Sequence, residues 1–106
     1  MTLPSPEGCF VQVWEQAHFV GLSDYINGPR RYPSLRDMPG RRSWRNRIGS
    51  FKVGPSSTVT VTVYSEENFR GNTLRAVRNT PLTELPGELK AQVQSIVVEC
   101  DGNPAQ

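Results

Sequence analysis

The stretch Tyr64-Ser65-Glu66-Glu67-Asn68-Phe69-Arg70-Gly71 decides the fold, because it combines two aromatic residues and a glycine at a fixed spacing. An aromatic residue at the end of a strand, a second one five residues later and a glycine two further on are typical of a hairpin that bends back on itself. The glycine permits a backbone angle that side chains resist. The same spacing occurs in Trp14-Glu15-Gln16-Ala17-His18-Phe19-Val20-Gly21, so all three anchors repeat at an offset of 50 residues. Such internal repetition predicts two related structural units.

Short runs of alternating or β-branched residues predict strands on both sides of each corner. The clearest run is 58–64, whose strict alternation places three valines on one face. Prolines and glycines exclude a regular helix through 29–47. Strands are expected at 10–14, 22–26, 48–53, 58–64, 71–77 and 93–99, with a short strand near 32–36 and a turn or short helical turn at 82–85. Neither unit can bury its own apolar face, so two antiparallel sheets should pack as a β-sandwich.

The length of 106 residues fits a single domain. We expect this domain to span 9–100, with the first unit at about 9–54 and the second at about 58–100, and with flexible tails at 1–8 and 101–106. No run approaches the length of about 18 apolar residues that a membrane span requires. The start lacks the basic and apolar regions of a signal peptide, which does not settle the compartment. We expect a monomer.

The two cysteines, Cys9 and Cys100, lie near opposite ends of the chain. A disulfide between them would tie the first strand to the last and close a loop of about 90 residues, worth about 4 kcal/mol in the chain-entropy model. Two buried thiols, which behave as small apolar groups, are the alternative. An oxidised pair would favour an extracellular or periplasmic location.

The cations are unevenly distributed, although the net charge is only +2. The segment 28–47, called the Arg-rich segment below, holds seven arginines and one acid, Asp37, which gives +6; the rest holds five cations and nine acids, which gives −4. The arginines are Arg30, Arg31, Arg36, Arg41, Arg42, Arg45 and Arg47. Net charge alone implies no partner, whereas this polarisation makes the Arg-rich segment the candidate contact surface.

The duplicated corner resembles the βγ-crystallin family, whose domains consist of two Greek-key motifs. In that family each corner is followed by a serine whose hydroxyl bonds back onto the bend, and here Ser50 and Ser95 stand in those places. The resemblance covers about 9–100 and implies a Greek-key β-sandwich. The first unit is longer, since 29 positions separate Gly21 from Ser50 and 24 separate Gly71 from Ser95, and its five extra residues fall in the Arg-rich segment.

Microbial members of that family often bind calcium through Asn/Asp-Asn/Asp-x-x-Ser/Thr-Ser, and calcium requires several oxygen ligands. The corresponding stretches here are Arg45-Asn46-Arg47-Ile48-Gly49-Ser50 and Lys90-Ala91-Gln92-Val93-Gln94-Ser95. A cation occupies the first position of each, and of the expected ligands at the fifth position Gly49 offers no side chain and Gln94 only an amide. In relatives the backbone after the first aromatic also holds the ion, which leaves Glu15 and Ser65 as remnants.

We therefore expect both calcium positions to be lost or weak, and we predict no cofactor. The degenerate positions are Glu15, Arg45, Asn46, Arg47, Gly49, Ser65, Lys90, Gln92 and Gln94. A sharper hypothesis places Arg45 and Lys90 where the ions lie in relatives, donating to the same backbone carbonyls, with the disulfide as the replacement stabiliser. The alternative is that both side chains point into water.

The remaining motifs give no support for catalysis. His18 is the only histidine and lies in a corner, where an exposed turn residue is the simpler interpretation. Glu66 and Glu67 are paired acids, but a two-stranded corner offers no cleft for acid–base chemistry. The sequence contains no phosphate loop, no CxxC pair and no nucleophile elbow, so we expect no enzyme.

The Arg-rich segment is the best candidate for binding, since arginines grip carboxylates and phosphates with two parallel hydrogen bonds. Tyr32 and Trp44 accompany its arginines, a combination that can hold single-stranded nucleic acid, although a protein or an anionic surface fits better. A solvated segment whose arginines pair with acids elsewhere is the plain alternative. We expect Trp14 in the core and Trp44 partly buried. The residues of the possible partner surface are Arg30, Arg31, Tyr32, Arg36, Arg41, Arg42 and Trp44.

Three functions remain open at this stage. The first is a non-enzymatic structural, stress or binding protein with weak or lost calcium binding, of bacterial origin and secreted. The second is a secreted proteinase inhibitor or antimicrobial toxin of the same fold, since inhibition needs a rigid scaffold that presents one loop. The third is a binder of anionic surfaces or nucleic acid through 28–47. The fold does not choose among them.

Overall fold

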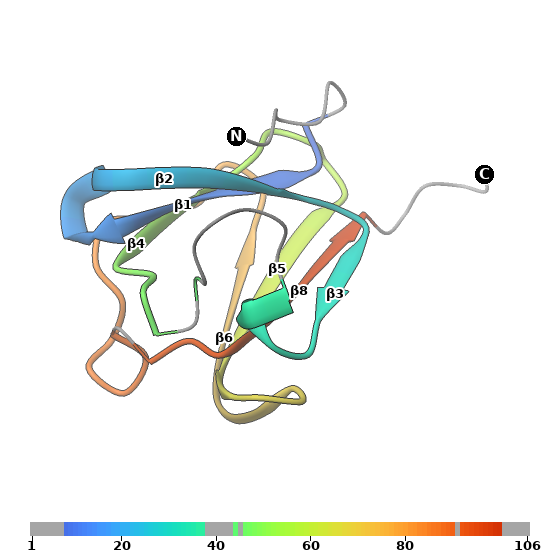
Figure 1. Ribbon diagram of the computed structural model, residues 1–106. Coiled ribbons are helices and arrows are strands. Elements are labelled where there is room, and N and C mark those ends of the chain that lie inside the picture. The colour runs from blue at the N-terminus through green and yellow to red at the C-terminus, as the bar shows by residue number, and fades with distance from the viewer. Residues whose placement is uncertain (1–7, 38–43, 45, 91, 101–106) are drawn as a thin grey trace.

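The computed structural model describes residues 8–37, 44, 46–90 and 92–100, which form eight strands and two short 3-10 turns. The strands are β1 (Phe10–Gln16), β2 (Val20–Asn27), β3 (Arg30–Tyr32), β4 (Ser50–Val53), β5 (Val59–Glu66), β6 (Arg70–Val77), β7 (Pro81–Leu82) and β8 (Ser95–Cys100) (Figure 1). The turns are η1 (Ala17–Phe19) and η2 (Leu35–Asp37). Most of the expected tails, 1–7 and 101–106, lie outside the described residues. Gly8, also assigned to a tail, is buried, and its carbonyl accepts a hydrogen bond from the Ser56 amide.

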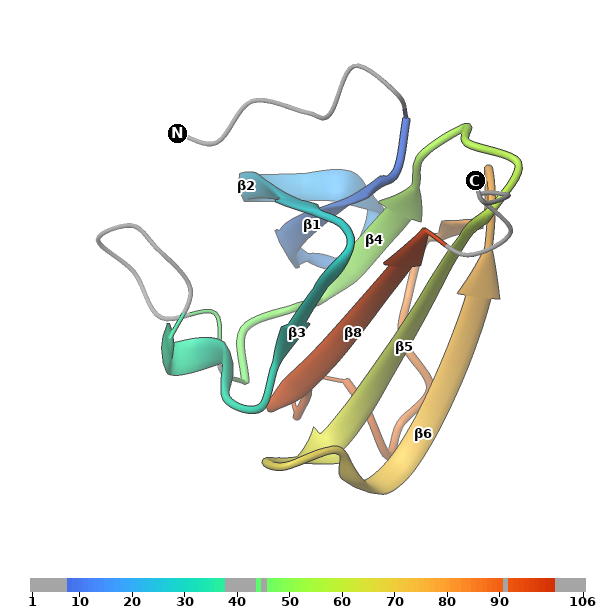
Figure 2. The ribbon, with the colours of Figure 1, turned by 90° about the vertical axis from the view of Figure 1, so that its right-hand side faces the viewer.

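The strands form two antiparallel four-stranded sheets with the orders β2-β1-β4-β7, called sheet A, and β3-β8-β5-β6, called sheet B. Figure 2 shows sheet B with β3 at one edge and β6 at the other. Each half of the chain gives one strand to the other half's sheet: β3 pairs with β8, and β7 pairs with β4. This crossing confirms the predicted two-sheet Greek-key sandwich.

Six expected strands are present, with ends that differ by a few residues. The short strand expected near 32–36 lies earlier, at β3, and the residues after it form η2 instead. The expected turn at 82–85 begins as β7, a two-residue edge strand that starts on Pro81. No sequence pattern can mark a strand of this length, and a proline is tolerated there because an edge position needs no amide donor.

The core lies between the sheets and is built from alternate residues of the strands. Those of β1 and β5 are Val11, Val13, Val59, Val61 and Val63, each at most 2% exposed. Burying an aliphatic side chain of this size contributes about 1.5–3 kcal/mol. Phe51 of β4, fully buried, is the largest side chain among them. The core is therefore shared by both halves of the chain.

The two tryptophans exchange their expected places. Trp14 is only half-buried and lies outside the core cluster, because Val11 and Val13 take the inward positions of β1 and alternation turns Trp14 outward. Trp44 is only 6% exposed and belongs to the core cluster. No helix among the described residues is long and apolar enough to cross a membrane.

Candidate functional site

The two corners have nearly the same backbone geometry. His18 and Phe19 both have φ values of 60°, and Asn68 and Phe69 have φ values of 63° and 61°. This left-handed region costs a residue with a side chain about 1–2 kcal/mol. The glycine of each corner also has a left-handed backbone conformation, with a φ of 92° at Gly21 and of 85° at Gly71. Four strained residues persist only where other contacts hold them.

The aromatic anchors of each corner lie against each other. The Trp14 and Phe19 rings are 4.9 Å apart at their centroids, and those of Tyr64 and Phe69 are 5.7 Å apart. Both distances fall within the favourable range for tilted or edge-to-face aromatic pairs. The second ring of each corner therefore folds back over the turn.

A fully buried serine ties each bend to the next strand of its sheet. Ser50 Oγ donates to the Gln16 carbonyl at 2.6 Å and accepts from the Phe19 amide at 3.0 Å. Ser95 Oγ makes the same two bonds, to the Glu66 carbonyl at 2.6 Å and from the Phe69 amide at 3.1 Å. Each hydroxyl thus satisfies two backbone groups of a strained turn.

Replacing Ser50 or Ser95 by alanine should lower the free energy of unfolding by about 2 kcal/mol, because each change leaves a buried donor and a buried acceptor unpaired. Urea unfolding measures the effect. Ser57→Ala, at an exposed serine outside the corners, is the matched control and should change stability by less than about 0.5 kcal/mol. Two serine variants as stable as the control would mean that these hydroxyls do not hold the bends.

Each corner is also held by the strand exchanged from the other half. The His18 amide donates to the Thr83 carbonyl at 2.7 Å, and the Asn68 amide donates to the Pro33 carbonyl at 2.8 Å. Thr83 follows β7 and Pro33 follows β3, again 50 residues apart. The sequence analysis missed these partners, although the offset of the corners could have indicated them. The side chain of His18 is exposed, as expected for a turn residue.

The first calcium position is closed by close backbone packing. The Gly49 amide donates to the Trp14 carbonyl at 2.8 Å. A Cβ at Gly49 would lie 2.6 Å from the Gln16 carbonyl carbon and 2.7 Å from the Glu15 carbonyl oxygen. A side chain that could bind calcium therefore has no room at the fifth motif position.

A salt bridge engages the remaining acid at that position. Arg47 Nη1 lies 3.3 Å from Glu15 Oε2, with side chains 49% and 29% exposed. The cation beside Glu15 is thus Arg47, whereas Arg45 lies outside the described residues. Asn46 is exposed, and its amide donates to the Val93 carbonyl at 2.9 Å. A guanidinium so close to the Glu15 carboxylate opposes a divalent cation, so the described residues of this motif do not fit calcium.

At the second calcium position, backbone hydrogen bonds hold Gln94 and an ion pair engages Lys90. The backbone amide of Gln94 donates to the Tyr64 carbonyl at 2.9 Å, and the backbone carbonyl of Gln94 accepts from the Leu35 amide at 2.9 Å. Lys90 Nζ lies 3.1 Å from Glu84 Oε2 on a half-exposed surface, which disagrees with the hypothesis that it donates to backbone carbonyls. Ser65 Oγ accepts from the Asn72 amide at 2.8 Å.

The other residues of the second motif add no acidic ligand. Gln92 is exposed, and Ala91 lies outside the described residues. Of the paired acids in this corner, Glu67 accepts a hydrogen bond from Ser34 Oγ at 2.7 Å, and Glu66 is exposed. The described part of the chain contains no group of three or more His, Cys, Asp or Glu residues placed to hold a metal ion.

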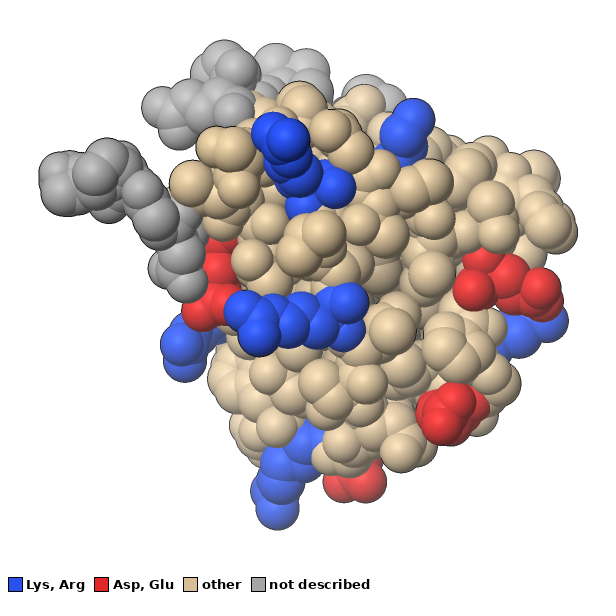
Figure 3. Space-filling view, turned by 180° about the vertical axis from the view of Figure 1, so that it is seen from behind, with Lys and Arg blue, Asp and Glu red and all other residues tan. Residues whose placement is uncertain are grey.

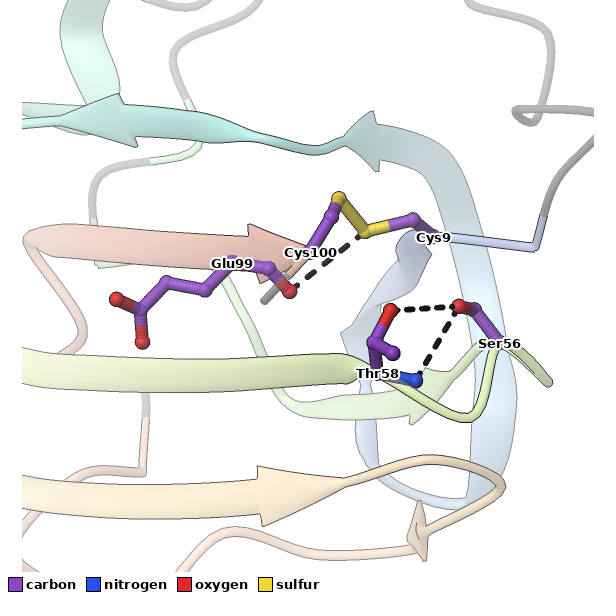
Figure 4. The surroundings of a disulfide bond; sticks show 5 residues. All are labelled: Cys9, Ser56, Thr58, Glu99 and Cys100. Carbon is purple, nitrogen blue, oxygen red and sulfur yellow. Dashed lines mark hydrogen bonds between the residues drawn. A yellow bond between two sulfur atoms is a disulfide. The ribbon is translucent and has the colours of Figure 1, made fainter. Parts of the chain in front are cut away.

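Cys9 and Cys100 form a disulfide with their Cα atoms 6.0 Å apart (Figure 4). The bond joins the start of sheet A to the end of sheet B. Cys9 is 3% exposed, and its sulfur lies 3.6 Å from the Glu99 carbonyl oxygen. Gly28 passes directly over the bond, since a Cβ there would be 2.9 Å from Cys100 Sγ. The pair is compatible with an oxidising compartment.

The described part of the Arg-rich segment exposes arginine side chains, whereas its aromatic side chains pack against or within the core. Arg30, Arg31 and Arg36 are exposed. The Arg30 guanidinium lies 5.8 Å from the centre of the Tyr32 ring, which itself packs against the core. Trp44 is buried and cannot stack on a ligand. Arg41 and Arg42 lie outside the described residues. Figure 3 shows one face of the molecule, where charged side chains are scattered over a mostly uncharged surface.

Comparison with solved structures places this arrangement among known folds. A structure concerned with the evolution of the eye lens βγ-crystallin domain fold matches 92% of this chain and 92% of its own, with 22% identity and a TM-score of 0.75. The chain has the βγ-crystallin fold. A βγ-crystallin domain from Flavobacterium johnsoniae matches 88% of this chain and 97% of its own, with 18% identity and a TM-score of 0.67.

A βγ-crystallin from Ciona intestinalis matches 83% of this chain and 96% of its own, with 15% identity and a TM-score of 0.66. No protein-family model matches the sequence, and neither does any curated protein. At these identities the likeness shows the βγ-crystallin fold alone.

Proposed function

We propose that this chain is a non-enzymatic binding module that keeps the βγ-crystallin fold without calcium. The close packing of Gly49 against β1 is the observation that carries the proposal, because it leaves no space for a ligand side chain. Buried serines and exchanged strands supply bonds to the bends from within the protein. The disulfide adds a covalent tie between the two sheets.

Binding occurs through the Arg-rich segment. Arg30 and Arg31 are exposed on β3 at the edge of sheet B, so their guanidinium groups are accessible to a partner. Exposed arginines on a rigid strand favour a protein carboxylate, because two parallel hydrogen bonds give both affinity and orientation. The module acts in an oxidising compartment, where its disulfide persists.

Calcium should leave the thermal unfolding midpoint unchanged within about 1 °C when millimolar CaCl2 replaces EDTA. A ligand present at 100 times its Kd stabilises the folded state by about 2.7 kcal/mol, which would shift the midpoint of a domain of this size by several degrees. Differential scanning fluorimetry measures the shift, and MgCl2 at equal ionic strength is the control. A rise of several degrees that is specific to calcium would reject the metal-independent module.

A further inference from the structure

A hollow opens beside β3 because the chain leaves sheet B at Pro29. Arg30 pairs with Val98, so Pro29 comes next to Glu99 in the ladder, but proline has no amide hydrogen to continue it. The chain instead turns toward sheet A, where the Gly28 amide donates to the Cys9 carbonyl at 2.9 Å. The last residues of β8 thus extend beyond the partner strand, next to a hollow of about 640 Å³.

Apolar and charged residues of β3 and β8 line this hollow. Val97 and Val98, 7% and 1% exposed, line it close to Cys100; the Val98 side chain belongs to the core cluster, and Val97, its neighbour on β8, points to the other face of sheet B. Arg30 and Arg31 also line the hollow; by the register of β3 and β8, Arg31 lies with Val97 on one face of sheet B and Arg30 lies with Val98 on the other. Glu99 contributes one carboxylate. The volume of the hollow lies within the range of about 300–1,000 Å³ that is typical of ligand pockets.

The position of Arg30 is partly fixed before any ligand arrives. Its guanidinium lies 5.8 Å from the centre of the Tyr32 ring, a cation–π contact worth about 0.5–1 kcal/mol at an exposed site. Such a contact reduces the conformational freedom that an arginine loses when it binds an anion.

We propose that this hollow binds an acidic, extended peptide segment of a partner protein. The carboxylates of the segment pair with Arg30 and Arg31, and its apolar side chains cover Val97. Within the described strands β3 has no neighbour on its outer side, so a peptide can also align with that edge. The inference rests on the proposed binding role of the Arg-rich segment and names the site and its ligand.

A nucleic acid fits this hollow less well than a peptide. Single-stranded binding requires free aromatic rings on which bases can stack. Tyr32 packs against the core beneath Arg30, and Trp44 is 6% exposed. The Glu99 carboxylate would also repel a phosphate backbone. Val97 beside Arg31, with Arg30 on the other face of the same strand, suits a chain that carries both carboxylates and aliphatic side chains.

The test uses the oxidised full chain and a fluorescein-labelled pentapeptide of alternating glutamate and valine, followed by fluorescence anisotropy. The double variant Arg30→Gln/Arg31→Gln should weaken binding by about tenfold or more, which corresponds to 1.4 kcal/mol. Arg70→Gln/Arg78→Gln removes the same charge from exposed positions outside the hollow and should weaken binding by less than about twofold.

A variant that binds the peptide more tightly cannot be explained by general damage to the fold, so it tests the site itself. Glu99→Gln removes the carboxylate of the hollow and should strengthen binding by about threefold, since it relieves repulsion of the acidic peptide. Equal weakening in the two double variants, or equal affinity for a lysine–valine peptide, would overturn the inference. So would binding only to a single-stranded oligonucleotide or to phosphatidylserine vesicles. None of these results depends on the calcium response, so the two proposals fail separately.

Discussion

Gly49→Ser is expected to lower the free energy of unfolding by about 3 kcal/mol, although it restores a residue type that calcium-binding βγ-crystallins use at this position. The new Cβ would lie 2.6–2.8 Å from three backbone atoms of Glu15 and Gln16. Backbone atoms cannot rotate away as a side chain can, so either the end of β1 or the residues that precede β4 must shift. Overpacking of this kind costs about 1–3 kcal/mol and sometimes more. Urea unfolding measures the loss.

Gln94→Ser is the matched control, because Gln94 holds the same motif position in the second unit and already carries a side chain. We expect this variant to lose less than about 1 kcal/mol. Gly49→Ser should also gain no calcium response. A serine variant as stable as the parent, or one that calcium stabilises, would show that the first position is open and would remove the main support for a metal-independent module.

The corners were predictable because their information is local. An aromatic residue, a second aromatic five positions later and a glycine define the bend. The serines that hold the bends lie 26–31 residues from the second aromatic, and only the family resemblance indicated their role. The duplication made each unit a check on the other. The strict alternation of β5 fixed its inward face for the same reason, since side chains in a strand alternate with a period of two.

Other features depend on contacts between distant segments and could not be read from one stretch. β7 exists only because β4 offers an edge to Pro81 and Leu82. Trp44 stands among arginines in the sequence, but the space between the sheets buries it. The ion pair between Arg47 and Glu15 joins residues 32 positions apart and was not predicted. A spacing rule identifies a motif position but does not say which way its side chain points.

The exchange of strands explains how two strained bends coexist in a chain of this size. Each bend receives hydrogen bonds from its own serine and from the strand that the other half contributes, so neither half is complete alone. In the first corner, a metal ion would have to bind where the backbone already packs closely around Gly49. The disulfide lies at the end of the sandwich where β1 begins and β8 ends (Figure 4).

Loss of the Cys9–Cys100 disulfide is expected to lower the free energy of unfolding by about 4 kcal/mol, which is a large part of the stability of a small domain. The two cysteines are 91 positions apart, so the bond restricts nearly the whole unfolded chain. Urea unfolding of the native protein with and without dithiothreitol measures the loss. Thiol titration should find no free thiol in the native protein and two after reduction in denaturant.

The variant Cys9→Ala/Cys100→Ala separates the cross-link from the packing of the sulfurs. It should be insensitive to dithiothreitol and slightly less stable than the reduced parent, because Cys9 is 3% exposed and its sulfur fills core space that alanine leaves empty. If the reduced parent were as stable as the oxidised one, the apolar core and the hydrogen bonds at the corners would hold the sandwich without the cross-link. Free thiols in the native protein would remove the support for action in an oxidising compartment. If only the alanine variant were destabilised, packing rather than covalent constraint would be the contribution of these residues.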